Sequence, residues 1–384
     1  MQGWRGSFRV ASFRGIPILI HFSLLLALPL LTLLFGKVFQ QAGASAGMGQ
    51  EQLGGVRYLW GLGVALGLFA SVLVHELAHV IYALRKGGEV RSITLMIVGG
   101  VSEVTEMPKR HRDEVLMALA GPLTSLGLAG LFFGVLLVLP QMRSFALPFC
   151  IFYLGMVNVM LGLFNLVPAF PMDGGRILRG LLAGKLGMVR ATSISAWVGR
   201  AFAVLFVIVG VLTVNPMLAI IGFFIFTGAG NESRQVLMRA ELEKLRVEQM
   251  MSPRFHGLDV NTSLAEALAE LRHERKLALP ITELEQPVGW VALADVLAVA
   301  EAERAGRSVR EVLKPAAVVS PEEDGWKALR RIIEAQPPVL LVLEQGRMVG
   351  TLDGNDIHAA MTLQVARQER ERTRASRWRQ ERPA

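Results

Sequence analysis

Three ionisable side chains stand close together inside a long apolar run. The string HELAH at residues 75–79 lies within the nearly charge-free stretch 58–84. In a helix, residues i and i+4 share a face, so His75 and His79 can both reach one Zn²⁺, with Glu76 beside the water that the metal binds. Zinc lowers the pKa of such a water towards about 7 and polarises a carbonyl group, which is the chemistry of peptide hydrolysis.

Two other interpretations also fit this string. The three side chains could form a buried polar cluster that links helices, or they could line an ion path. Ionisable residues inside an apolar span are costly and usually functional. Neither alternative explains the spacing of the two histidines, so the pattern favours a zinc site that still needs a third protein ligand.

Asp173 is the candidate third ligand. It follows Pro168 and Pro171, which interrupt the fourth apolar run, and it precedes the paired glycines 174–175. Prolines end a helix and glycines let the backbone bend closely, so a carboxylate can turn inward here. An interfacial turn with a solvated aspartate would have the same local sequence, but the HELAH string favours the ligand.

Together, HELAH and the pattern N-x-x-P-x-x-P-M-D-G-G at residues 165–175 resemble the site-2 protease family of intramembrane metalloproteases, over about residues 10–230. The string GPLTS at 121–125 is similar to the family's small-residue packing motif and is interpreted as structural. The resemblance implies a zinc ion and five site residues: the ligands His75, His79 and Asp173, the general base Glu76, and Asn165, which would contact the substrate or the developing oxyanion.

The elements that must position these residues are apolar helices. The chain has 384 residues, of which 52% are hydrophobic, and its mean hydropathy is +0.43. Spanning a bilayer takes about 20 apolar residues. Six runs qualify, at 17–36, 58–84, 113–139, 146–168, 192–213 and 216–230, with Asn215-Pro216 as a turn between the last two. The first run is interpreted as a retained membrane helix rather than a cleaved signal peptide.

A small β hairpin is expected between the second and third runs. Residues 90–98 are rich in β-branched side chains, and two glycines separate them from residues 101–104. Unpaired strand edges are too costly in hydrocarbon, so the hairpin must be shielded or lie at the membrane interface. It is a candidate platform on which an extended peptide adds as a further strand.

The basic residues predict an orientation. The net charge is +8, but it is interpreted as juxtamembrane rather than as a surface for nucleic acid. Lys and Arg cluster at Arg5, Arg9 and Arg14, at Arg85, Lys86, Arg91, Lys109, Arg110 and Arg112, and at Arg176, Arg179, Lys185 and Arg190; the opposite loops hold Lys37, Arg57 and Arg143. Both termini should therefore be cytoplasmic in a multi-pass protein of the cell membrane. Cys150 is the only cysteine, which excludes an internal disulfide and a cysteine metal site.

The charged C-terminal part, residues 231–384, is expected to be soluble and cytoplasmic. Its strings at 287–296 and 347–357 echo one another about 60 residues apart, and the repeat resembles a tandem pair of α/β CBS domains. The predicted organisation is a protease domain at 1–230, a linker helix at 231–246, CBS repeats at 247–305 and 306–364, and a charged tail at 365–384.

The CBS resemblance implies a homodimer and an adenine nucleotide as candidate partners. A Ser or Thr usually stands three residues before the terminal Asp, but here Ala292 precedes Asp295 and Asp353 precedes Asp356. Alanine lacks the hydroxyl, and an aspartate would repel phosphate. Dimerisation or gating without nucleotide is therefore favoured over nucleotide sensing. Asp295 and Asp356 are interpretable as helix caps.

The expected function is that of an intramembrane zinc endopeptidase that cuts a membrane-anchored protein. In fold, it is an α-helical polytopic membrane domain of about six helices with a membrane-associated β hairpin, followed by the CBS pair. An ion carrier or channel governed by the CBS pair is the main alternative, since some transporters carry such modules. A catalytically idle scaffold is disfavoured, because every expected ligand is present.

Overall fold

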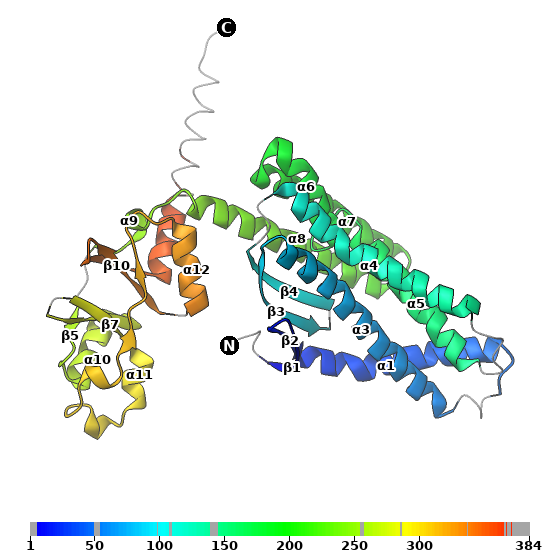
Figure 1. Ribbon diagram of the computed structural model, residues 1–384, viewed down its shortest axis with the longest axis horizontal. Helices are drawn as coiled ribbons and strands as arrows, with labels where there is room; N and C mark the ends of the chain where they lie inside the picture. Colours follow the sequence, from blue (N-terminus) through cyan, green and yellow to red (C-terminus); the bar gives the residue numbers. More distant parts are fainter. Residues whose placement is uncertain are drawn as a thin grey trace, which may run out of the picture. The chain divides into compact units, whose positions relative to one another are not determined.

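The computed structural model describes residues 6–49, 54–97, 99–106, 110–138, 145–253, 257–284, 286–335 and 337–364, together with 366 and 370. The chain divides into two compact units, Met1–Val236 and Leu237–Ala384, and Figure 1 shows their elements. The rest of the predicted tail at 365–384 lies outside the described residues, as do Arg143 and Val98.

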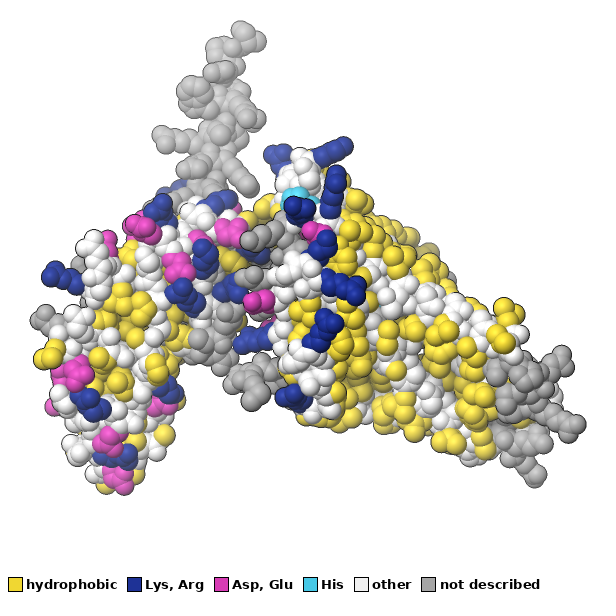
Figure 2. All heavy atoms as spheres, in the orientation of Figure 1, with side chains coloured by type: hydrophobic (Ala, Val, Ile, Leu, Met, Phe, Trp, Pro, Cys, Tyr) yellow, Lys and Arg dark blue, Asp and Glu magenta, His cyan; other side chains and the backbone are white. Residues whose placement is uncertain are grey.

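The first unit is built from long apolar helices. Within the described residues, five helices are long and apolar enough to cross a membrane: α1 (Phe22–Ser45), α3 (Val56–Arg85), α4 (His111–Val138), α5 (Ala146–Asn165) and α7 (Met188–Leu212). Figure 2 shows a largely apolar surface on this unit, with Lys and Arg gathered towards one end of it. The prediction of a polytopic helical membrane domain is confirmed. The sixth predicted run forms the first half of α8 (Pro216–Leu242), which is not among the five.

The predicted hairpin is part of a larger sheet, whose described strands lie in the order β1-β2-β3-β4. β3 (Glu89–Met96) and β4 (Gly99–Glu106) are antiparallel and form the expected hairpin. β1 (Ser7–Phe13) and β2 (Ile16–His21) form a second antiparallel pair, and β2 joins β3 in parallel through Ile18 opposite Ile93. β4 is therefore one edge of the sheet and β3 lies inside it.

The prediction of a membrane helix starting at residue 17 was wrong at its beginning. Residues 16–21 are strand β2, and α1 starts only at Phe22. Ile16 and Ile18 are buried with Ile93 against Val80 of α3. A short apolar run such as residues 16–21 fits a strand or a helix equally well. It forms a strand here because it pairs with β3, more than 70 residues further along the chain.

The segment between α5 and α6 (Asp173–Leu186) is held by α8. α8 starts beyond the predicted turn, where Asn215 Oδ1 accepts hydrogen bonds from the backbone N–H groups of residues 217 and 218. Along α8, Ile225 packs with the 169–172 segment. A Cβ at Gly228 would lie 2.9 Å from the Pro171 ring, so only glycine permits this approach. The same helix then continues to Leu242, past the boundary between the units.

The second unit contains two modules with the same order of elements. The first has β5 (Leu258–Asp259), α10 (Leu264–His273), β6 (Ala278–Glu283), β7 (Gln286–Ala292) and α11 (Leu293–Ala298). The second has β9 (Val318–Val319), α12 (Gly325–Ala335), β10 (Val339–Glu344), β11 (Arg347–Asp353) and a helix over 354–364. Shorter elements are α9 (Val247–Met250), β8 (Lys314–Pro315) and two 3₁₀ turns, Glu301–Glu303 and Val309–Glu311. Each module has its own hydrophobic core, and Leu242 of α8 belongs to the second.

Candidate metal centre

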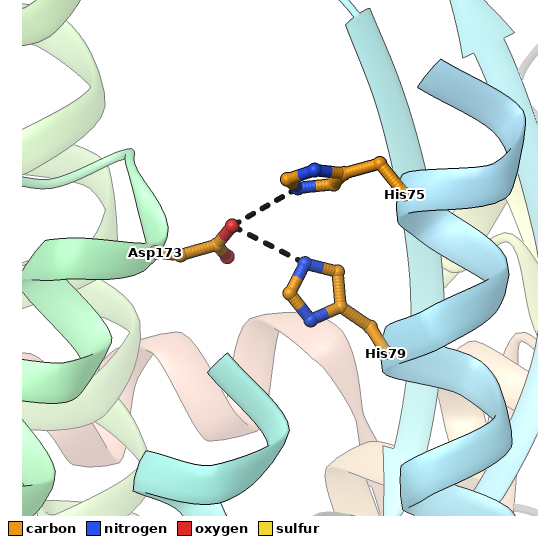
Figure 3. A group of neighbouring side chains, drawn as sticks. All are labelled: His75, His79 and Asp173. Atoms are coloured by element: carbon orange, nitrogen blue, oxygen red, sulfur yellow. Dashed lines mark hydrogen bonds and ion pairs between the residues drawn. The ribbon is translucent and has the colours of Figure 1, made fainter. Parts of the chain in front are cut away.

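His75, His79 and Asp173 meet at one point inside the first unit. Both histidines project from α3, and Asp173 is the first residue of α6. Asp173 Oδ2 lies 3.1 Å from His75 Nε2 and 3.2 Å from His79 Nε2, as Figure 3 shows. The three ligand atoms lie within 4.8 Å of one another. The structure thus brings together residues separated by almost 100 positions, as the sequence predicted.

The outer ring nitrogens of both histidines are held by α4. His79 Nδ1 lies 2.7 Å from the backbone oxygen of Met117, and His75 Nδ1 lies 2.8 Å from Ser125 Oγ. A carbonyl oxygen only accepts, so His79 Nδ1 must donate its proton there and a neutral His79 presents a lone pair at Nε2. Two imidazole nitrogens and one carboxylate oxygen are a donor set that Zn²⁺ accepts, with a fourth position left for water. The residues therefore fit a zinc ion.

Gly121 of α4 lies directly against this point. A Cβ at Gly121 would lie 2.2 Å from His79 Nε2 and 2.5 Å from His75 Nε2. The GPLTS string, predicted to have only a packing role, thus also gives the site its space through Gly121 and one of its hydrogen bonds through Ser125. The spacing of residues in the string carried no signal of either contact, because both depend on how α4 packs against α3.

Glu76 is held by the edge strand β4. Ser102 Oγ lies 2.6 Å from Glu76 Oε2 and donates a hydrogen bond to it. Gly100 also approaches closely, since a Cβ there would lie 2.2 Å from Glu76 Cγ. Glu76, both histidines and Asp173 line one cavity of about 350 Å³. The sheet therefore positions the candidate base, while α4 positions the two histidines.

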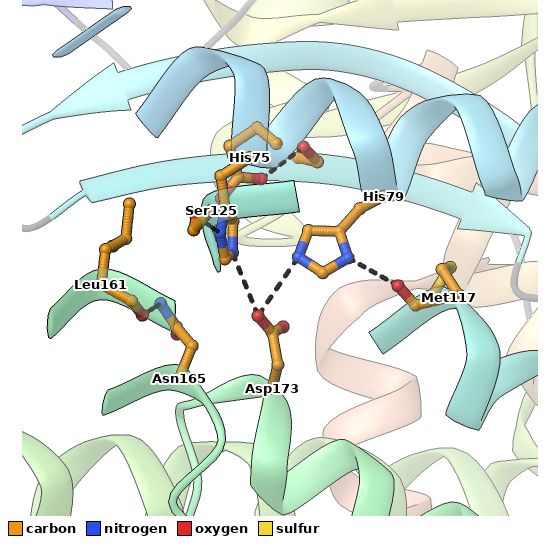
Figure 4. Close-up of polar contacts among 9 residues, drawn as sticks. His75, His79, Met117, Ser125, Leu161, Asn165 and Asp173 are labelled. Carbon is orange, nitrogen blue, oxygen red and sulfur yellow. Dashed lines mark hydrogen bonds and ion pairs between the residues drawn. The ribbon is translucent and has the colours of Figure 1, made fainter. Parts of the chain in front are cut away.

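Asn165 lies at the C-terminal end of α5 and lines the same cavity. Its Nδ2 donates to the backbone oxygen of Leu161, 2.9 Å away, and Figure 4 shows this contact beside the His–Asp cluster. Among the described residues, no hydrogen bond joins Asn165 to His75, His79 or Asp173. The structure places Asn165 in the cavity without a direct bond to the ligands.

Two arginines that lie between the fourth and fifth apolar runs, as expected, belong to helix α6 and point inward rather than into a loop. Arg179 is 3% exposed and binds Glu114 of α4 through Nη2 at 2.6 Å and Glu232 of α8 through Nη1 at 2.8 Å. Burial alone would raise the pKa of Glu232, but Arg176 and Arg179 lower it. Arg176 lines the cavity. Both arginines thus have inward roles that a charge count along the chain does not reveal.

Comparison with known proteins gives consistent matches. The model of peptidase family M50 matches residues 63–147 and 141–206, and the CBS domain model matches residues 247–302. A zinc metalloprotease of Methanocaldococcus jannaschii is 29% identical over 369 residues, covering 94% of this chain and 98% of that protein. The Rip3 protein of Mycobacterium tuberculosis is 32% identical over 318 residues, covering 79% and 81%. The solved site-2 protease from Methanocaldococcus jannaschii is 31% identical, covers 59% of this chain and 95% of that one, and superposes with a TM-score of 0.43.

Proposed function

Because the chain belongs to peptidase family M50, the family of the site-2 proteases, we propose that it is an intramembrane zinc endopeptidase that hydrolyses a peptide bond in or near a transmembrane segment of a membrane-anchored protein. The observation that carries this proposal is the meeting of His75, His79 and Asp173 beside Glu76, within a unit of five membrane-capable helices. The lipid bilayer and the protein substrate are its partners.

Four side chains are proposed to hold the metal or to transfer protons. His75, His79 and Asp173 would hold Zn²⁺, which when bound supplies a water of lowered pKa and polarises a carbonyl oxygen. Glu76 accepts a proton from the water as its oxygen bonds to the carbonyl carbon, and then delivers that proton to the amine nitrogen, which leaves as the C–N bond breaks. The hydrogen bond from Ser102 keeps the Glu76 carboxylate turned towards the cavity.

Asn165 is proposed to donate its amide N–H to the oxygen of the scissile carbonyl. Its position in the cavity lining supports this role. One of its N–H groups bonds to Leu161, and the second remains for the substrate. A hydrogen bond that strengthens as the oxygen becomes negative lowers the barrier to hydrolysis.

The proposed activity is tested on the full chain purified in detergent. We expect one zinc ion per chain by metal analysis, and cleavage of a model transmembrane peptide that a chelator abolishes and added zinc restores. Ion flux into liposomes that Glu76→Gln leaves unchanged, with no cleavage, would instead support the ion-carrier alternative. A chain that holds no zinc and cleaves no peptide refutes the proposal.

A substrate helix must unwind before cleavage, and β4 offers its backbone a partner. β4 is the edge strand of the sheet and also holds Glu76. An extended peptide paired with β4 would satisfy its own hydrogen bonds in lipid and pass beside the base. The unwound segment is therefore proposed to add to β4 as a fifth strand.

Proline substitutions in β4 should reveal this pairing. Prolines at 93–98 would break β3, which lies inside the sheet, so the edge strand is the informative place. Val101→Pro and Val104→Pro are expected to differ, because backbone N–H groups alternate between the neighbouring strand and the free edge. The proline that replaces an N–H at the free edge should leave zinc content and thermal stability unchanged but abolish cleavage of the model peptide. Full cleavage by that variant contradicts strand addition.

The orientation is proposed with both termini and the second unit in the cytoplasm. The basic residues that remain at the surface support it, among them Arg85 and Lys86. His75 lies ten residues before Arg85, so at 1.5 Å per residue the metal would lie about 15 Å below that surface. A tag fused to the C-terminus should resist protease in intact cells; digestion of the tag would reverse the orientation.

The second unit is proposed to act in dimerisation or gating without adenine nucleotide. Asp353 and Asp356 cap the last helix reciprocally: Asp353 Oδ1 accepts from the backbone of Asp356 at 3.0 Å, and Asp356 Oδ2 accepts from that of Asp353 at 2.9 Å. Ser252 Oγ donates to the other oxygen of Asp356. In the first module, Asp295 pairs with Lys314 at 2.7 Å instead of capping a helix. These carboxylates are already occupied, and they repel phosphate.

ATP is therefore not expected to bind the second unit. We expect no change in the unfolding temperature of the full chain at millimolar ATP, and no change in its cleavage rate. Asp353→Thr, which replaces the carboxylate by the missing hydroxyl, is the matched variant for gain of binding. Saturable ATP binding by the unchanged chain would restore nucleotide sensing, and mass photometry in detergent tests the homodimer.

A further inference from the structure

Arg176 is a cation of the metal cavity for which the described part of the chain offers no bonded partner. It lies on α6 one turn after Asp173 and lines the cavity together with Glu76 and Asn165. Among the residues that the structure describes, its guanidinium group makes no hydrogen bond and no ion pair within 4.0 Å. A sheltered guanidinium group with unused donors is costly unless an acceptor reaches it.

The neighbouring Arg179 shows what a structural arginine looks like in this unit. Its Nε and Nη2 bind Glu114 at 2.7 and 2.6 Å, and its Nη1 binds Glu232 at 2.8 Å. The same helix thus carries one arginine bonded to two carboxylates and another, Arg176, for which no such bond is present among the described residues. Glu114 and Glu232 spend their hydrogen bonds on Arg179 and reach Arg176 only by longer-range attraction.

The remaining carboxylates near Arg176 are also engaged. Asp173 contacts both histidines, and Glu76 accepts a hydrogen bond from Ser102. Burial alone would lower the pKa of Arg176, but Glu232, Asp173, Glu76 and Glu114 together raise it. Arg176 therefore stays charged in the cavity and keeps its donors for a group that comes from outside.

Peptide hydrolysis creates a negatively charged acceptor of this kind at the oxygen of the scissile carbonyl group. The carbonyl oxygen becomes negative when water adds to the carbon, and it ends as one oxygen of the new carboxylate after the C–N bond breaks. A guanidinium group is always charged and presents planar, paired donors that match these oxygens. Asn165 offers only a neutral amide, part of which is already bonded to Leu161.

We propose that Arg176 is a further catalytic residue, which binds the scissile carbonyl oxygen as it becomes negative and then holds the carboxylate of the N-terminal product. The inference rests on the proposed peptidase function. Arg176, on the same helix as Asp173, would thus bind the part of the substrate that carries the scissile carbonyl group. The ligand that it should recognise is a peptide with a free C-terminal carboxylate.

Binding of a product-like peptide tests this role without cleavage. The probes are acetyl-Leu-Leu-Leu as the free acid and as its C-terminal amide, and their affinities for the zinc-loaded full chain are measured by thermal shift. We expect Arg176→Gln to reduce the acid-over-amide preference about tenfold, as loss of a charge-assisted hydrogen bond predicts. Lys185→Gln, which removes an exposed charge from the same helix, should keep the preference.

Kinetics and metal content complete the test. Arg176→Gln should lower kcat for the model peptide about 10²-fold, the scale seen when one oxyanion donor is removed, with zinc content unchanged. Arg176→Lys should have a kcat and an acid-over-amide preference between those of the unchanged chain and of Arg176→Gln. It replaces Arg176→Gln in both measurements if the glutamine variant does not fold. An unchanged acid-over-amide preference overturns the proposal, and so does loss of zinc from Arg176→Gln, which would make Arg176 a positioning residue for Asp173. A wild-type chain that binds the acid through Arg176 but cleaves nothing refutes the peptidase function alone.

Discussion

Glu76→Gln is expected to slow cleavage by about 10²–10⁴-fold while zinc stays bound, as removal of a general base predicts. The amide cannot accept the proton of the attacking water, whereas His75, His79 and Asp173 are untouched. The side-chain shape and the contact with Ser102 are nearly preserved, so the loss should appear in kcat. The measurement is steady-state cleavage of the model peptide together with zinc content by mass spectrometry.

Glu103→Gln is the matched control for that change. Glu103 lies on β4 next to Ser102, but consecutive strand residues face opposite sides, and its side chain is 44% exposed. The Glu103→Gln variant should cleave the model peptide at nearly the normal rate. Near-normal cleavage by Glu76→Gln would place the base elsewhere, and loss of zinc from that variant would show that Glu76 acts on the metal rather than on the proton.

Asp173→Ala is expected to empty the site of zinc and to reduce cleavage to background. Two imidazoles from a single helix supply only two ligands, and protein zinc sites of this kind use three. Zinc content after dialysis, compared with that of Asp113→Ala, measures the effect. Asp113 pairs with Lys86 at 3.0 Å outside the cavity and is the control. Retention of zinc by Asp173→Ala would mean that another residue completes the site.

Charge adds a second expected effect of metal removal. Around the cavity, the described carboxylates of Glu76, Glu114, Asp173 and Glu232 face two guanidinium groups, those of Arg176 and Arg179. A divalent cation balances this excess of negative charge, and uncompensated charge away from water is destabilising. Chelation should therefore lower the unfolding temperature of the wild-type chain, whereas Asp173→Ala should respond much less to the chelator. An equal shift in both proteins would show that the site does not contribute.

The metal ligands could be predicted from the sequence because most of their geometry is local. Helical periodicity places His75 and His79 on one face whatever surrounds them. Asp173 was found through its prolines and glycines, although its approach to α3 depends on the packing of the helices around it. Such a contact is indicated by a motif only because the residue type suits the metal.

The parts that sequence reasoning missed depend on distant neighbours. Strand β2 was read as the start of a helix because its apolar residues run into those of α1, and only pairing with β3 distinguishes the two. Gly121 and Ser125 touch the histidines from α4, and nothing in their own segment indicates the contact. Arg176 and Arg179 looked like loop charges because a count along the chain carries no information about burial.

The continuity of α8 determines how the two units can be separated experimentally. The helix that packs against the 169–172 segment through Ile225 and Gly228 also supplies Leu242 to the core of the second unit. A stop codon after Val236 would end the chain inside this helix, one turn beyond Glu232, and helix ends fray. Lost cleavage in such a shortened protein would report a loosened support for Asp173 and not the removal of a regulator. Deletions meant to isolate the membrane unit should therefore retain the helix to Leu242, with polar replacements for the side chains uncovered near its end.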